Sequence, residues 1–274
     1  MDFIEIALSD PRVFLEIGII TVCVLALFAD LISDCWNRRL KVEPWRAAMG
    51  DFTFFMWMLL LAFFLGQFAG AQAVHLIEER LGENADDWLL VVGGLALHVP
   101  WLLILLLGMR FYPDKFPYPL SFEHPGLGKL FLRMFMYLFA AAPVLFVVKL
   151  FWAEVFEFWN RRALGVDMVP QAFVEILREG ASPLLITLLG ISAVFLAPVT
   201  EELIFRGGLY RFFKARMRPI LALVLSSALF ASLHMNLLAF LPLFCLGALF
   251  VRMYEKTGNI WVPVGVHAAF NLVT

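Results

Sequence analysis

The sequence is poor in charge and in cysteine. Only 16% of its 274 residues are charged, whereas 62% are hydrophobic. A soluble domain of this length needs far more polar surface to stay in solution, so that class is excluded. The net charge of −2 gives no general attraction for nucleic acid, and we expect no nucleic-acid partner. The three cysteines are scattered and match neither a disulfide framework nor the spacing of metal ligands.

The sequence also lacks a positively charged segment before its first apolar run. Asp2, Glu5 and Asp10 stand there instead, where a cleavable signal peptide would carry positive charge. We therefore expect the first run to remain as a spanning helix. No sequence repeat, low-complexity tract or soluble domain interrupts the chain.

Long apolar runs dominate the rest of the sequence. Several reach the roughly 20 residues that a helix needs to cross a bilayer, and they predict an all-α, polytopic membrane protein with about eight transmembrane helices. The stretch 152–182 mixes tryptophan with charged residues and predicts a helix in the headgroup region. The expected spans are 13–32, 52–74, 88–109, 130–151, 184–213, 220–234, 237–253 and 260–274.

Positive charge alternates between the loops. The loops after the first, third, fifth and seventh spans are rich in Lys and Arg, and the loop after the second is acidic. By the positive-inside rule, both termini then lie on the non-cytoplasmic side. We divide the chain into 1–182, whose role is unassigned, and 183–274, a helical core. The last span has only about 15 apolar-rich residues, so it is tilted, partial or cut short.

The fifth span holds three charged residues, each of which costs roughly 2.5–3.5 kcal/mol at the centre of a spanning helix. They are Glu201, Glu202 and Arg206. Glu202 and Arg206 lie one helical turn apart and are able to pair. Glu201 lies about 100° around the helix, with no cation on its own face. A carboxylate left over in an apolar site suits the work of a general base.

Two histidines follow in later spans. His234 ends the sixth span, and His267 lies in the eighth, one turn before Asn271. Counted along the helices, Glu201 and His234 each lie about 20 Å from the cytoplasmic edge, and His267 lies about 10 Å in if its span starts at Ile260. Three helices can therefore present these groups at overlapping depths, with His267 the least well matched.

Glu-Glu-x-x-x-Arg, Phe-x-x-x-His and His-x-x-x-Asn thus occur in this order on successive apolar helices. This combination resembles the CAAX protease and bacteriocin-processing family of intramembrane glutamic endopeptidases, which includes the type II CAAX prenyl proteases. The resemblance covers roughly 184–274. It implies cleavage of a peptide or lipidated protein within the lipid bilayer, of the CAAX or leader-peptide type, with a bacterial plasma membrane as the expected location. The site residues that it implies are Glu201, Glu202, Arg206, His234, His267 and Asn271.

The resemblance also implies a role for each of these residues. Glu201 would act as general base on a water that His234 also holds, and the hydroxide would attack the peptide carbonyl. His267 and Asn271 would stabilise the oxyanion. Glu202 and Arg206 would organise the site. Amide hydrolysis needs a base, a bound water and oxyanion donors, so the residue types agree with this assignment.

Two alternatives stay open. Glu201, His234 and His267 could ligate zinc and leave a position open for water. No His-Glu-x-x-His motif is present, and we favour catalysis without a cofactor. The rival function is a non-catalytic membrane protein, such as a transporter or scaffold, that uses the buried charges for ions or helix packing. A transporter would more often show repeated halves, and the sequence has none.

Two features of the other spans carry no assigned function. His98 lies mid-span before Pro100, and a lone histidine at a helix break is usually a satisfied packing residue. Gly66-x-x-x-Gly70 in the second span can pack helices closely, although the pattern is common.

Overall fold

The structure is a computed structural model, and it describes residues 40–81, 86–118, 120–160 and 182–273. The predicted span 13–32 and most of the predicted headgroup helix lie outside the described residues. Within the described part, every named element is helical. Four stretches there are long and apolar enough to cross a membrane, which fits a multi-pass integral membrane protein. They are Met49–Arg80, Trp88–Phe111, Leu127–Phe158 and Pro183–Lys214.

The first three long helices are α3 (Met49–Leu81), α4 (Asp86–Phe111) and α5 (Leu127–Trp159). They confirm the spans predicted at 52–74, 88–109 and 130–151, and each runs several residues beyond the prediction. The predicted boundary at 151 is wrong, because α5 continues without a break through 152–159. No Pro or Gly separates these two stretches, and Phe156 is buried, so the helix has no reason to end.

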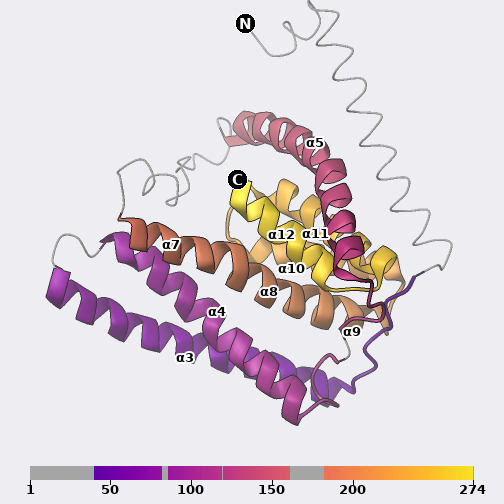
Figure 1. Cartoon of the computed structure of the whole chain (residues 1–274), viewed down its shortest axis with the longest axis horizontal. Helices are drawn as coiled ribbons and strands as arrows, with labels where there is room; N and C mark the ends of the chain where they lie inside the picture. The colour runs from indigo at the N-terminus through magenta and orange to yellow at the C-terminus, as the bar shows by residue number, and fades with distance from the viewer. Residues whose placement is uncertain (1–39, 82–85, 119, 161–181, 274) are drawn as a thin grey trace, which may run out of the picture.

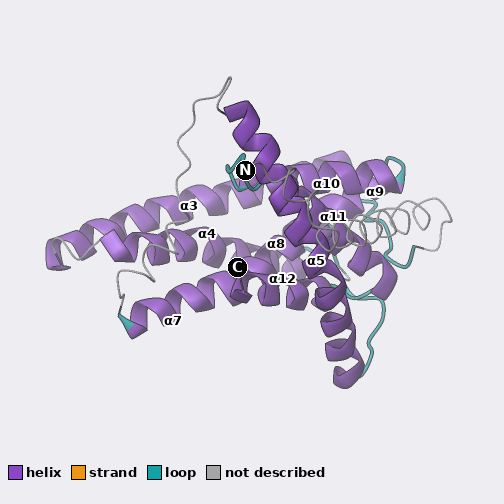
Figure 2. Cartoon of the chain, turned by 90° about the horizontal axis from the view of Figure 1, so that it is seen from above, coloured by secondary structure: helices purple, strands orange, loops and turns teal. Residues whose placement is uncertain are grey.

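Helices α3 and α4 lie side by side in both views (Figures 1 and 2). Their contact depends on the two glycines of α3. A Cβ atom added at Gly66 would lie 1.9 Å from the carbonyl oxygen of Ala96, and one added at Gly70 would lie 2.8 Å from the Ala96 Cβ. The close packing expected of the Gly66-x-x-x-Gly70 pattern is therefore confirmed, with α4 as the partner.

The C-terminal part begins with one continuous helical run that changes its winding. Its pieces are α7 (Pro183–Ile191), the π-helical η3 (Ser192–Leu196), α8 (Ala197–Glu202), the π-helical η4 (Leu203–Tyr210) and α9 (Arg211–Lys214). The run starts where Ser182 accepts a hydrogen bond from the Leu185 N–H and Pro183 occupies the first helical position, both of which favour a helix start.

Three shorter helices complete the core at the positions of the last three predicted spans, and none of them is among the four stretches that are long and apolar enough to cross a membrane. They are α10 (Pro219–Leu233), α11 (Phe240–Thr257) and α12 (Trp261–Val273). Pro219 starts α10, and Gly258 ends α11 with a φ of 61°, the left-handed conformation that glycine adopts without strain. Helix α8 contacts both α4 and α12, while α11 packs against α5, α10 and α12. The buried core is densest around α11.

The glycine contact makes the first prediction. Gly66→Ala places a methyl group against the α4 backbone and should destabilise the protein by roughly 1–3 kcal/mol, the cost of overpacking. The matched control is Gly93→Ala in α4, where an added Cβ would have no atom within 4 Å. The melting temperature of each variant in detergent measures the difference. An equal effect of the two substitutions would contradict the close packing.

Candidate active site

The site is built around the carboxylate of Glu202, whose side chain is completely buried. Arg206 donates from Nη1 to Glu202 Oε1 over 2.9 Å, which forms the pair that the spacing predicts. The Nδ1 of His267 lies 3.0 Å from the same oxygen. A buried ion pair is stable only when further hydrogen bonds satisfy its charges, and His267 supplies one of them. Glu202 therefore joins the fifth predicted span to the eighth.

The guanidinium of Arg206 is enclosed by aromatic rings and backbone. It lies over the rings of Phe230 and Phe250, with 4.4 Å and 4.9 Å between the guanidinium carbon and the ring centroids. Its Nη2 donates to the carbonyl oxygen of Gly247 over 3.2 Å. A Cβ atom at Gly247 would lie 3.3 Å from Nη2, so glycine keeps this approach open. The cation is thus fixed by α8–η4, α10 and α11 together.

Glu201 is placed differently from its neighbour. Its side chain keeps 14% exposure, and Oε2 accepts no hydrogen bond from the part of the chain that the structure describes. The Nε2 of His267 lies 3.8 Å from Oε2 of Glu201. His267 therefore faces both carboxylates, Glu202 through Nδ1 and Glu201 through Nε2.

The imidazole of His267 is held in place by two phenylalanine rings. It stacks on Phe250 at 4.9 Å between ring centroids and meets the edge of Phe230 at 5.9 Å. His267 is therefore next to both carboxylates, although the count along the helices made it the least well matched of the three groups. Asn259 and Ile260, which precede α12, are buried within the protein.

His234 follows the last residue of α10. Its Nδ1 lies 2.8 Å from the carbonyl oxygen of Phe230. A carbonyl only accepts, so Nδ1 carries the proton of the neutral ring and Nε2 carries the lone pair. The rings of His234 and Phe230 lie 4.8 Å apart, and Phe230 also meets His267. One phenylalanine ring therefore contacts both histidines.

Asn271 donates a hydrogen bond to the carbonyl of Ala193, which receives none from the helix that contains it. The N–H of Ala197 bonds to Ser192 rather than to Ala193, as the π-helical winding requires. The next residue, Pro198, has no N–H to offer. Asn271 Nδ2 donates to the Ala193 carbonyl over 2.8 Å. Because the membrane core offers no water, this bond from α12 supplies the Ala193 carbonyl with a hydrogen-bond donor that it would otherwise lack.

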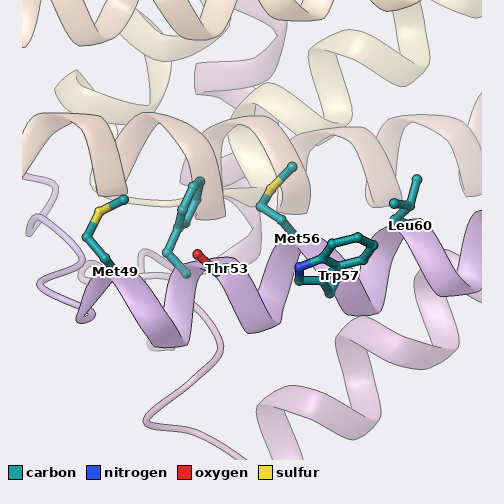
Figure 3. A pocket seen from close by; sticks show the side chains of 6 residues that line it. Met49, Thr53, Met56, Trp57 and Leu60 are labelled. Atoms are coloured by element: carbon teal, nitrogen blue, oxygen red, sulfur yellow. The ribbon is translucent and has the colours of Figure 1, made fainter.

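A metal centre was tested against the same residues. Among the described residues, no three His, Cys, Asp or Glu side chains are gathered as a metal ion would require, Glu201, His234 and His267 included. A hollow of about 310 Å³ lies elsewhere, along one face of α3 (Figure 3). It offers no charged group for chemistry and resembles the lipid-facing surface around it. Its lining residues are Met49, Phe52, Thr53, Met56, Trp57 and Leu60.

Sequence reasoning missed one histidine near the site. His98 of α4 bonds to Thr200, the residue before Glu201, and interacts electrostatically with Glu201, His234 and His267. It is a satisfied buried residue, as expected, but it stands beside the site rather than apart from it. The available signal was the rarity of an ionisable side chain in the middle of a span.

The helices that carry this arrangement are similar to those of known proteins. Residues 183–273 match the family described as Type II CAAX prenyl endopeptidase Rce1-like. A curated relative, "Putative membrane peptidase YdiL" of Bacillus subtilis (strain 168), is 24% identical over 224 residues that cover 78% of this chain and 85% of the relative. The C-terminal core of the chain is therefore similar to the type II CAAX prenyl endopeptidases, and most of the chain is similar to a protein named as a membrane peptidase. No solved structure gives a significant match.

The buried pair makes a prediction about stability. Arg206→Met leaves the Glu202 carboxylate buried without its main partner and should cost about 3–5 kcal/mol. Adding Glu202→Gln removes the orphaned charge, so the double variant should melt at a higher temperature than Arg206→Met alone. A thermal shift assay in detergent measures both. A double variant no more stable than the single one would refute this account.

The π-helical segment makes another prediction. Asn271→Ala should destabilise the protein by roughly 0.6–1.7 kcal/mol, the range of hydrogen bonds between membrane helices. Pro198→Ala restores an N–H that can reach the Ala193 carbonyl. Asn271→Ala should therefore cost less in the Pro198→Ala background, as a double-mutant cycle of melting temperatures measures. Equal costs in the two backgrounds would show that Asn271 does not serve this carbonyl.

Proposed function

We propose that the protein is an intramembrane endopeptidase in which Glu201 activates water to hydrolyse a peptide bond. The observation that carries the proposal is the unequal treatment of two adjacent carboxylates. Oε1 of Glu202 is bonded to Arg206 and His267, and its side chain is completely buried, whereas Glu201 has no arginine partner and keeps 14% exposure. Each carboxylate has an Oε2 without a hydrogen bond among the described residues. A general base must reach water and be free to take up its proton, and Glu201 is the one of the two that keeps exposed surface and is not paired with an arginine.

The water would lie between Glu201 and His234. The Nε2 lone pair of His234 can accept one hydrogen of this water, and Glu201 can accept the other as the oxygen attacks. The proton that Glu201 takes up is then available for the leaving amine nitrogen when the tetrahedral intermediate collapses. Both proton transfers use the same carboxylate, so no further acid is required.

The oxyanion would be stabilised by His267 and Asn271. His267 is fixed by Glu202 and two phenylalanine rings, and its Nε2 faces the carboxylate that would hold the water. Nδ1 donates to Glu202, so donation from Nε2 to the oxyanion requires the imidazolium form, in which both ring nitrogens carry a proton. Asn271 has a second N–H beyond the one given to Ala193. Donors that are already fixed cost no reorganisation during the reaction, which is what makes an oxyanion hole effective.

Catalysis without a metal is part of the proposal, with zinc as the alternative. The chemistry assigned to Glu201 and His234 is complete without a Lewis acid. The substrate would be a membrane-associated protein or peptide, with a prenylated CAAX terminus as the first candidate because the matched family is described by it. Leader-peptide processing is the second candidate.

The proposal is tested in proteoliposomes with peptides that end in a prenylated Cys-aliphatic-aliphatic-X sequence and with leader-peptide mimics. Glu201→Gln should reduce kcat by about 10²–10⁴-fold, the contribution of general base catalysis. His234→Ala should also reduce kcat, because the water loses a partner. Glu123→Gln is the matched control, since Glu123 forms an ion pair with Lys41 in a loop away from the site and should leave cleavage unchanged.

Two outcomes would overturn the mechanism. Equal cleavage by wild type and Glu201→Gln would remove Glu201 as the base. Loss of activity after thorough chelation, restored by added zinc, would replace the metal-free reaction with the zinc alternative.

A further inference from the structure

Helix α4 brings a polar residue to the site from outside the matched region 183–273. Helix α4 contacts α7, η3 and α8. At Gly94 the approach is so close that an added Cβ would lie 2.5 Å from the Ser192 hydroxyl oxygen. His98 lies one turn after Gly94 on the same face, and it meets the same helical run about two turns after Ser192, at Thr200.

His98 makes one well-defined hydrogen bond there. It is 6% exposed, and its Nδ1 lies 2.7 Å from the hydroxyl oxygen of Thr200, which is completely buried. The Thr200 hydroxyl also lies 2.8 Å from the Leu196 carbonyl and 3.1 Å from the Ala197 carbonyl. A carbonyl can only accept, so the hydroxyl proton belongs to one of these two, and His98 Nδ1 is the donor to Thr200.

The hydrogen bond between His98 and Thr200 is made to α8, a helix whose own backbone hydrogen bonds do little to fix its rotation. Helix α8 has only six residues, lies between two π-helical segments and contains Pro198. Each of these features removes or redirects hydrogen bonds that would otherwise fix its rotation. Contacts from neighbouring helices must therefore fix the turn that carries Thr200 and Glu201.

We propose that His98 is a positioning residue of the active site, which fixes the direction of Glu201 by holding Thr200. The inference rests on the proposed function of Glu201. It assigns α4 a part in catalysis, although α4 lies outside the matched family region. The titratable groups that interact electrostatically with His98 are Glu201, His234 and His267, and its hydrogen bond to Thr200 places it one residue away from Glu201.

Three substitutions of His98 separate the hydrogen bond from the ring. Asn places an amide N–H near the position of Nδ1 and keeps the donor to Thr200. Gln places it near Nε2 and loses that donor, and Phe removes it altogether. His98→Phe and His98→Gln should lower kcat by about 10- to 10²-fold with little change in KM, because misplacing a catalytic group by 1 Å costs up to about 10²-fold. His98→Asn should recover most of the rate.

The partner and the control complete the kinetic test. Thr200→Val should lower kcat to the same extent as His98→Phe, and the double variant should be no worse than either single one, because all three lack the same bond. Gly93→Ala is the control on α4, since an added Cβ there would have no atom within 4 Å. It should leave kcat unchanged. His98→Asn as slow as His98→Phe would overturn the proposal.

A second measurement does not depend on cleavage. The infrared carboxyl bands of Glu201, identified by difference from Glu201→Gln, should shift in His98→Phe and Thr200→Val but not in His98→Asn or Gly93→Ala. If wild type cleaves none of the peptides and the bands still shift, the proposed function fails while the positioning role stands. If wild type cleaves and the bands are indifferent to His98, the positioning role is wrong and the proposed function stands.

Discussion

The structure of the site depends on one buried oxygen, Oε1 of Glu202, which receives both Arg206 and His267. Two bonds to this atom tie η4 and α12 to α8, and the arginine extends the link to Gly247 of α11. A charge buried in a bilayer protein is expensive unless every partner is in place. The Glu202 carboxylate is therefore stable in the protein only when these three helices pack correctly. The same packing fixes the position of Glu201, the preceding residue.

The spans and the arginine pair could be predicted from the sequence because both are local. Apolar length predicts a spanning helix, and a four-residue separation predicts the pairing of Glu202 with Arg206. The Gly66-x-x-x-Gly70 pattern likewise predicted a close contact. The pattern did not predict that α4 is the partner, because small residues allow any helix to approach closely.

The remaining features depend on tertiary placement and could not be predicted. The contact of His267 with both carboxylates requires α12 to pack against α8, which a count from the end of a span cannot include. The bond from Asn271 to Ala193 requires both the altered winding of η3 and the approach of α12. His98 looked like an isolated packing residue because its partner, Thr200, lies 102 residues away in the sequence.

The irregular winding on both sides of α8 explains why so many polar residues gather there. A π-helical turn and a proline leave backbone carbonyls without donors, and hydrocarbon cannot supply them. Asn271 meets one such carbonyl, while the hydroxyl of Thr200 turns back to Leu196 and Ala197. The same residues stand next to Glu201 or on the helix that carries His267. The polar residues that pair with these backbone carbonyls are therefore also the surroundings of the site. A substitution that restores regular α-helical hydrogen bonding there should also disturb the site.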